Sequence, residues 1–487
     1  MESLQELQLK RLLDRLEALG NRLPDPLVLF ALMALAVVLA SALLAGTQVT
    51  HPGTGAPTLV QSLVTAPSVR RMFTEAVKNF AGFPPLGTVL VAVMGIGLAD
   101  RTGLVAAVLG GLVRSLPRRW LTLALLFAGV NSSIAADAGF VVLVPLGAAL
   151  YAGAGRHPLA GLTVAYAAVS GGYGANVLVT ALDPLLAGLT QAAAQLIDPA
   201  LLVPATCNWW FNAVSVVLLC AVGTVVAERT EASFGPWAGS VVVDEGPRPA
   251  LGLPAIVFVA WLGVVAALVG TGVLRADDGG FGPLYDAVVV LVAIGAALPA
   301  LAFGIGNGRI RSSSDLATLL AEATAGMGGY IVLAFAAAQF VAWFAWSNLG
   351  IVLAVTGADL VRPLGLGPEP LLLVMVLVSG VVNLLIASAS AKWAILAPVF
   401  VPMLLLLGVS PAETQAAYRV GDAVTNVLTP LLPYVPIVLV AARRYVPGAG
   451  LGTVLAAQVP YAVAFGVAWT ALLLGWVAMG WSLGPGA

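Results

Sequence analysis

Apolar stretches separated by short polar ones run through nearly the whole chain. Nine of these stretches reach the roughly 20 residues that a helix needs to cross the hydrocarbon of a bilayer. They lie at residues 27–46, 84–113, 158–182, 205–227, 251–274, 284–306, 326–347, 412–441 and 453–479. We therefore predict nine membrane-spanning helices.

Two further apolar stretches, 120–152 and 370–410, are too long for one crossing and too short for two. Small polar residues lie at their middles, and non-helical backbone at membrane depth is tolerated only where protein or a water-filled cavity satisfies it. We expect a re-entrant helical hairpin in each. The predicted fold is an all-α polytopic membrane protein with four spans and one hairpin in a first half (27–227), a cytoplasmic loop (228–250), and five spans and one hairpin in a second half (251–487).

The composition agrees with a lipid bilayer as the surroundings. Of the 487 residues, 60% are hydrophobic and 9% charged, and the mean hydropathy is +1.00; an ordinary soluble domain has about 25% charged residues. A net charge of −1 without a basic patch argues against a nucleic-acid partner. The two cysteines and two histidines lie far from any acidic cluster, so we expect no disulfide framework and no cofactor held by them.

Lysine and arginine indicate how the chain is oriented. Residues 1–26 have an amphipathic, charged pattern without a signal-peptide cleavage site, and we expect a cytoplasmic or interfacial helix there. Cytoplasmic loops are enriched in Lys and Arg. With the N-terminus inside, fourteen of these residues fall in the cytoplasm and five outside. The first hairpin then enters from the cytoplasm and the second from the opposite face.

The two halves share a repeated pattern. VNSSIA (130–135) matches VNLLIA (382–387) in four of six letters, and Ala-Tyr follows in both halves at the same offset of 252 residues. NVLVTALDPLL (176–186) similarly faces NVLTPLLP (426–433). Together with the opposite entry of the hairpins, this predicts inverted repeats, which are typical of secondary transporters with midplane sites on discontinuous helices.

Charged residues in such helices are costly and are therefore candidates for function. Arg419 and Asp422 are three residues apart, hence on one helix face. The guanidinium could hold a carboxylate substrate bidentately, while Asp422 orients it or exchanges a proton. The alternative is a salt bridge between Arg419 and Asp422 that contacts no ligand.

Asp183 lies in the sequence ALDP and follows the glycine-rich SGGYGAN (170–176), which should unwind its helix. Because burial disfavours the charged form of a carboxyl group, Asp183 is our first candidate for a proton carrier. Its alternative role is to cap the helix that follows.

Polar residues gather at the two predicted hairpin tips: Asn131, Ser132, Ser133 and Asp137 at the first, and Asn383, Ser388 and Ser390 at the second. Their oxygens suit a hard cation such as sodium, although turns also favour Asn and Ser for local reasons. Trp393, beside the second tip, could stack on an aromatic ligand or serve in packing.

Four segments resemble the p-aminobenzoyl-glutamate transporter (AbgT) family: FAGFPPLGTVLVAVMGIGLADRTGL (80–104), SSIAADAGFVVLVPLGAALYAGAGRHPLAGL (132–162), ASASAKWAILAPVFVPML (387–404) and YRVGDAVTNVLTPLLPY (418–434). The resemblance implies nine transmembrane helices with two re-entrant hairpins in a bowl-shaped homodimer of the bacterial inner membrane. It also implies functional roles for Asp183, Asn383, Ser390, Trp393, Pro411, Arg419, Asp422 and Pro430, and a sodium ion near the asparagine and aspartate region, for which Asn131, Asp183 and Asn383 are the expected ligands.

The expected function is secondary active transport of p-aminobenzoyl-glutamate or related aromatic amides and carboxylates. Proton-driven efflux of sulfonamide-type antimetabolites is the first reading, with Asp183 or Asp422 coupling the proton. A sodium- or proton-coupled importer of p-aminobenzoyl-glutamate is the alternative. An intramembrane enzyme would need a metal cluster or a nucleophile with a base at membrane depth, where histidine is missing. A passive channel would not accumulate substrate against a gradient.

Overall fold

The computed structural model describes residues 26–51, 55–115, 117–135, 139–237, 250–325, 327–386 and 388–486. Within these ranges the chain is almost entirely helical, which confirms the all-α prediction. The described strands are one antiparallel pair, β1 (Gln48–Thr50) and β2 (Pro57–Leu59). The predicted helix at 1–26, apart from its last residue, and Asp137 at the first tip lie outside the described residues.

Five helices of the described ranges are long and apolar enough to cross a membrane. They are α11 (Trp209–Glu231), α12 (Gly252–Gly270), α13 (Gly282–Gly306), α15 (Gly328–Trp346) and α21 (Leu451–Ala478). Each coincides with a predicted span. A sixth candidate is the pair α5 (Pro84–Arg101) and α6 (Leu104–Ser115), which is bent by 65°. The single crossing predicted at 84–113 is thus divided, because Gly103 takes a positive φ of 84° between the two helices.

Two other predicted spans, 158–182 and 412–441, are not continuous helices. The first consists of α9 (Pro158–Tyr166), the π-helical turn η4 (Ala167–Gly171), an irregular stretch, and α10 (Leu182–Ala194). The second consists of α19 (Pro411–Asn426), an irregular stretch, and α20 (Val435–Arg443). Glycines in the first break and prolines in the second explain the interruptions, since glycine disfavours helix and proline lacks the N–H that a helix needs.

The two predicted hairpin regions are each divided at the expected tip. The first contains α7 (Leu121–Val130), the 3₁₀ turn η2 (Asn131–Ala135), the π-helical turn η3 (Gly139–Leu143) and α8 (Val144–Gly153). The second contains α17 (Pro368–Asn383) and α18 (Ala389–Leu405). Each of these helices is shorter than the roughly 20 residues of a full crossing.

The remaining helices are short or lie outside the stretches that hydrophobicity selected. They are α2 (Pro26–Leu43), α3 (Ala66–Thr74), α4 (Ala76–Ala81), α14 (Ser313–Ala325), α16 (Leu349–Val361), η1 (Arg118–Trp120), η5 (Ala232–Phe234) and η6 (Arg362–Leu364). Of these, α2 falls within the predicted span 27–46. The apolar helix α16 was not predicted, because its 13 residues are too few for a span.

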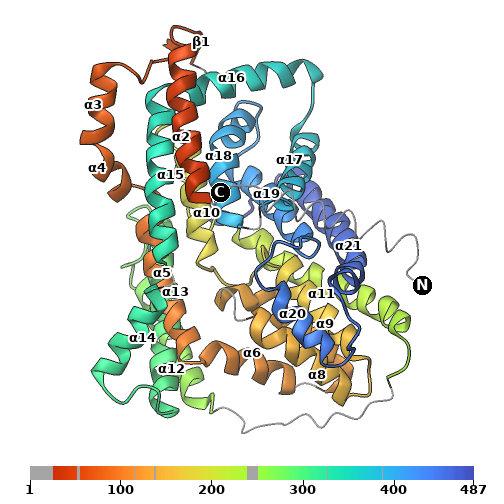
Figure 1. Cartoon of the computed structure of the whole chain (residues 1–487). Coiled ribbons are helices and arrows are strands. Elements are labelled where there is room, and N and C mark those ends of the chain that lie inside the picture. Colours follow the sequence, from red (N-terminus) through yellow and green to blue (C-terminus); the bar gives the residue numbers. More distant parts are fainter. Residues whose placement is uncertain are drawn as a thin grey trace.

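Helices α2, α15, α5, α13, α12 and α14 stand together along one side of the molecule, and the broken helices lie on the other side (Figure 1). Contacts of α5 with α10 join the two groups. Within the second group, α17 packs on α19, α8 packs on α9, and α18 packs on both α10 and α16. The two breaks and the two tips are therefore held inside a well-packed region of the protein.

Candidate functional site

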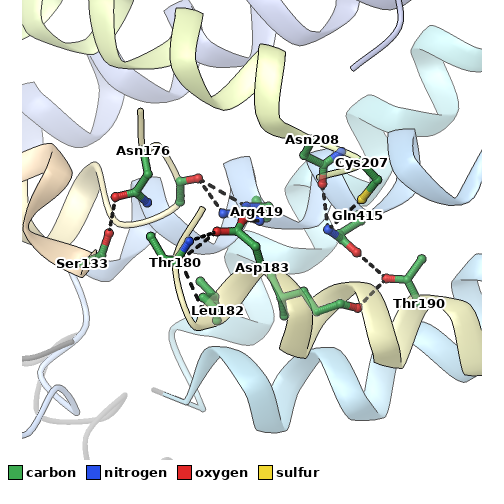
Figure 2. A network of polar contacts seen from close by, with 12 residues as sticks. Ser133, Asn176, Thr180, Leu182, Asp183, Thr190, Cys207, Asn208, Gln415 and Arg419 are labelled. Carbon is green, nitrogen blue, oxygen red and sulfur yellow. Dashed lines mark hydrogen bonds and ion pairs between the residues drawn. The ribbon is translucent and has the colours of Figure 1, made fainter. Parts of the chain in front are cut away.

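A buried ion pair joins the two broken helices. Arg419, on α19, donates from Nη1 to Asp183 Oδ1 at 2.6 Å, and the two side chains are only 2% and 5% exposed. Nε and Nη2 of the same guanidinium donate to the carbonyl oxygen of Gly174, at 3.3 and 3.0 Å. Gly174 lets the helix come this close, since a Cβ there would lie 3.3 Å from the Arg419 carbonyl oxygen. Figure 2 shows Asp183 and Arg419 meeting beside Thr180.

Asp183 lies in the first turn of α10, whose N-cap position is Ala181 and has no side-chain capping hydrogen bond. Its Oδ2 accepts from the Thr180 backbone N–H at 2.6 Å and from the Thr180 hydroxyl at 2.8 Å. The alternative that Asp183 caps the helix is therefore not realised, because its carboxylate accepts hydrogen bonds from Thr180, which precedes the helix. A carboxylate in the first turn of a helix is stabilised by the helix dipole as well as by its own hydrogen bonds.

A second buried ion pair lies one helical turn away along α19. Lys392 Nζ is 2.5 Å from Asp422 Oδ1, and Nζ also donates to Asn383 Oδ1. Asn383 Nδ2 donates to the Asp422 carbonyl oxygen and to Thr425 Oγ1, both at 2.8 Å. Among the ion pairs of the described residues, Arg419 and Asp422 thus have different partners, and the alternative of a salt bridge between them is not realised.

Lys392 is a charged residue at membrane depth to which sequence reasoning assigned no role. The side chain is fully buried, whereas lysine is almost never fully buried without a partner. The available signal was its isolation, as the only charge in an apolar stretch of about forty residues. We did not use that signal to name a partner, because neither Asp422 nor Asn383 stands at helical spacing from it.

Trp393 is fully buried between α10 and α19. Its ring stacks on that of Tyr418, with 4.4 Å between centroids. Nε1 donates to Thr190 Oγ1 at 2.9 Å and to the Leu186 carbonyl oxygen at 3.3 Å. In this conformation the ring serves in packing, and its stacking on a ligand stays a prediction.

A chain of side-chain hydrogen bonds extends from Trp393 to the start of α11. Thr190 Oγ1 donates to Gln415 Oε1 at 2.6 Å, and Gln415 Nε2 donates to Asn208 Oδ1 at 2.8 Å (Figure 2). Asn208 Nδ2 in turn donates to the Ala412 carbonyl oxygen at 2.9 Å. Sequence reasoning missed these contacts, because they join residues about 200 positions apart with no common motif. They hold α10 and α19 in register beside the ion pairs.

The two prolines assigned by resemblance lie at the ends of the α19 region. Pro411 is the first residue of α19, directly after Ser410. The Ser410 hydroxyl and the Glu413 carboxylate form a capping box at this helix start. Pro430 lies in the break between α19 and α20. Both prolines therefore define where the charged helix begins and where the chain leaves it.

The first tip is fastened to the first break. Asn131 Oδ1 accepts from the Val177 backbone N–H at 2.9 Å, and its Nδ2 donates to the Phe127 carbonyl oxygen. The Ser133 hydroxyl donates to Asn176 Oδ1 at 2.8 Å. At the second tip, the side chain of Ser388 caps α18, and Ser390 is half-buried.

A cavity of about 760 Å³ lies where both tips and both breaks meet. Its polar lining includes Asp100, Arg101, Ser133, Ser170, Tyr173, Tyr330, Ser388, Ser390, Asn426 and Tyr434. The stacked rings of Phe140 and Tyr434, 4.4 Å apart, form part of its apolar lining. The Oδ1 atom of Asn426 and the hydroxyl of Tyr330 are buried without a hydrogen-bond partner. The cavity therefore combines aromatic surface with polar side chains.

The predicted sodium ligands do not form one cation site in this arrangement. The side-chain oxygens of Asn131, Asp183 and Asn383 accept hydrogen bonds from three separate sets of donors, those of Val177, of Arg419 with Thr180, and of Lys392. In the described part of the chain, no cluster of three or more His, Cys, Asp or Glu residues could hold a metal. The residues as placed do not fit a bound sodium ion.

Comparisons with known proteins identify the family. The family model of the AbgT putative transporter family matches residues 11–487. The chain belongs to the AbgT family. It is 36% identical over 483 residues to the p-aminobenzoyl-glutamate transport protein of Escherichia coli strain K12, covering 96% of this chain and 95% of that protein. The resemblance seen in the sequence motifs is confirmed, and this AbgT protein is a membrane transporter.

Two solved AbgT-like structures share the fold over nearly the full length. The YdaH transporter of Alcanivorax borkumensis is 43% identical, with a TM-score of 0.92, over 95% of this chain and 100% of that chain. MtrF of Neisseria gonorrhoeae, described as illuminating a class of antimetabolite efflux pumps, is 37% identical, with a TM-score of 0.90, over 96% and 97% of the two chains. The broken helices of this AbgT chain therefore occur in a transporter fold.

Proposed function

We propose that this AbgT chain is a secondary active transporter that exports p-aminobenzoyl-glutamate or sulfonamide-type antimetabolites, driven by the proton gradient. The observation that carries the proposal is the pair of buried ion pairs beside a cavity with aromatic and polar lining. Buried charges are costly in a membrane protein and are kept where they serve transport. The efflux role of MtrF supports the export direction.

Protonation of Asp183 is the proposed coupling step. All the described contacts of the Arg419 guanidinium are with Asp183 and Gly174. A substrate amide or sulfonamide N–H could donate to the ionised Asp183 carboxylate while Arg419 holds its carboxylate or sulfonyl group, whereas a proton on Asp183 would remove that acceptor. Substrate and proton would then compete for the same pair of side chains. Asp422 is the second proposed proton carrier, through its pair with Lys392.

We also propose nine spans and two re-entrant hairpins that enter from opposite faces, as inverted repeats. The short helices on each side of both tips, and the same order of hairpin and broken helix in both halves, support this arrangement. The N-terminus would lie in the cytoplasm and the protein in the bacterial inner membrane as a homodimer. Alternating access would move the hairpin region against the row of helices that contains α2, α5 and α15.

Import is the second candidate direction. The name of the Escherichia coli relative, a p-aminobenzoyl-glutamate transport protein, favours it, because that relative covers almost the whole chain. The same site could bind the same solute in either direction, since gradient and coupling ratio set the direction of net flux.

Flux into proteoliposomes with an imposed pH gradient tests the proposal. We expect uphill accumulation of labelled p-aminobenzoyl-glutamate and sulfamethazine in a pH-dependent manner, and loss of the pH-driven part in Asp183→Asn. Asp198→Asn is the matched control, because Asp198 is an exposed loop carboxylate. Unchanged pH-driven accumulation in Asp183→Asn would refute the proton-carrier role. Downhill flux alone would indicate a channel, and chemically altered solute would indicate an enzyme.

A further inference from the structure

The surroundings of Lys392 have the composition of a small cation site. Its ammonium group lies between a carboxylate oxygen of Asp422 and the amide oxygen of Asn383, in the protein interior. Both oxygen-bearing side chains are held from other directions. Asn383 Nδ2 donates to Thr425 Oγ1, and the Tyr418 hydroxyl, which donates to the Ala389 carbonyl oxygen at 2.5 Å, lies 3.4 Å from Asp422 Oδ1. The two oxygens thus converge on one point, and that point contains the lysine nitrogen.

A sodium ion and an ammonium group bind to the same kinds of ligand atom at such a point. Each carries one positive charge and is satisfied by carboxylate, carbonyl and hydroxyl oxygens. Only one of them can occupy a position that both oxygens contact. Since Lys392 is tethered to α18, its effective concentration there is far above that of a free ion.

We propose that Lys392 is a built-in cation that takes the place of a bound sodium ion at Asn383 and Asp422. The protein then needs no sodium at this position, and Lys392 fastens α18, at the second tip, to α17 and α19. The inference concerns only which cation lies between Asn383 and Asp422. It does not depend on which solute is transported or on proton coupling.

The buried charge of Asp422 makes the inference testable with variants of Lys392. Removal of the ammonium leaves the Asp422 carboxylate buried beside neutral groups, and breaking a buried pair by removing one partner is strongly destabilising. A sodium ion that enters the vacated space restores the charge balance. Sodium should therefore stabilise the Lys392→Ala variant and leave the wild-type protein unaffected.

Thermal unfolding of the purified full-length protein in detergent tests the inference. The wild type is compared in chloride salts of sodium, potassium and N-methyl-D-glucamine, at about 100 mM each, because a ligand that binds only the folded state raises the apparent melting temperature. We expect equal melting temperatures in all three salts. A rise of about 2 °C or more that is specific for sodium in the wild type would overturn the inference.

A variant that removes the Lys392 ammonium group and leaves space for an ion should respond to sodium, in contrast to the wild type. Lys392→Ala should melt below the wild type in N-methyl-D-glucamine and rise by about 2 °C or more in sodium. Lys392→Met is the matched control, because it also removes the charge but fills the space that sodium would occupy, and it should not respond. The double variant Lys392→Ala with Asp422→Asn should lose the response. A folded Lys392→Ala protein without a sodium-specific rise would refute the proposal.

If Lys392→Ala is recovered only when purified in sodium, that rescue supports the inference. If it is recovered in neither salt, Lys392→Ser replaces it, since the serine hydroxyl adds one oxygen ligand. A sodium-specific rise in the wild type overturns the inference in every case. Because melting temperature is independent of flux, failure here and failure of the proposed transport function are separate outcomes.

Discussion

The two halves of the molecule have the same skeleton but a different charge content. Each has a divided hairpin followed by a broken helix, and Tyr166 and Tyr418 occupy the same place in the repeat. The second half carries buried charges where the offset of 252 residues places uncharged residues in the first. These positions are Lys392, Arg419 and Asp422 in the second half, and Phe140, Ala167 and Ser170 in the first.

This difference shows which residues form the hairpins and broken helices, and which buried charges are additional to them. The tip asparagines do equivalent work in both halves, since Asn131 binds the backbone of Val177 and Asn383 binds the carbonyl oxygen of Asp422. Among the described residues of the first half, the hairpin and the break contain no buried Lys or Arg. The ions of the second half are therefore not required by the skeleton, and their cost argues for a role in transport.

The largest effect is expected from the ion pair that joins the halves. Arg419→Gln leaves the Asp183 carboxylate buried without its counter-charge, and we expect a loss of about 3–5 kcal/mol in the free energy of unfolding. The apparent melting temperature in detergent measures it. Adding Asp183→Asn to Arg419→Gln should recover a large part of the loss, because no unpaired charge remains.

Arg362→Gln is the control for that experiment. Its partner Asp359 is 2.7 Å away, but the two side chains are 61% and 56% exposed. Exposed pairs contribute about 0–1 kcal/mol, so its melting temperature should stay near that of the wild type. Similar losses in Arg362→Gln and Arg419→Gln would contradict the role of burial.

A smaller effect is expected where hairpin and broken helix approach most closely. In the second half the small residue is Gly421, on the broken helix, and an added Cβ would lie 2.1 Å from the Val376 carbonyl oxygen. In the first half it is Gly129, on the hairpin, where a Cβ would lie 2.4 Å from Ala168 Cβ. The close-contact glycine thus lies on the hairpin in the first half and on the broken helix in the second half.

Gly421→Ala should cost more than Gly129→Ala, because a backbone carbonyl yields less readily than a methyl group. We expect about 1–3 kcal/mol for overpacking, with Gly421→Ala at or above the upper end. Gly475→Ala, where nothing lies within 4 Å of the added Cβ, is the control and should be near neutral. The ranking of melting temperatures checks this, and a reversed order would contradict the comparison.

Much of this architecture could be predicted from hydrophobicity and the repeat. The two tips, the break after SGGYGAN and the break near Pro430 lie where glycine, proline and small polar residues interrupt apolar runs. The bend between α5 and α6 and the short helix α16 could not, because hydropathy reports the length of an apolar run and not its direction.

Which site residues form ion pairs with each other was harder to predict than which residues belong to the site. Helical spacing suggested that Arg419 would face Asp422, whereas its partner Asp183 is 236 positions away. A partner on another helix leaves no periodic trace in a single sequence. For the same reason the stack of Trp393 on Tyr418 and the contacts of Lys392 became visible only in three dimensions.

The smallest effect concerns two asparagines that begin the breaks, Asn176 and Asn426. Asn176 Oδ1 accepts from Ser133, whereas Asn426 Oδ1 is buried beside the cavity without a partner. Asn176→Ala should lose about 1 kcal/mol of stability with the hydrogen bond. Asn426→Ala breaks no hydrogen bond of the Oδ1 atom and should lose less stability, and it should instead raise the KM for transport several-fold, because Asn426 lines the cavity. Melting temperatures and flux kinetics of both variants measure this split, and equal stability losses would show that the two halves use their asparagines alike.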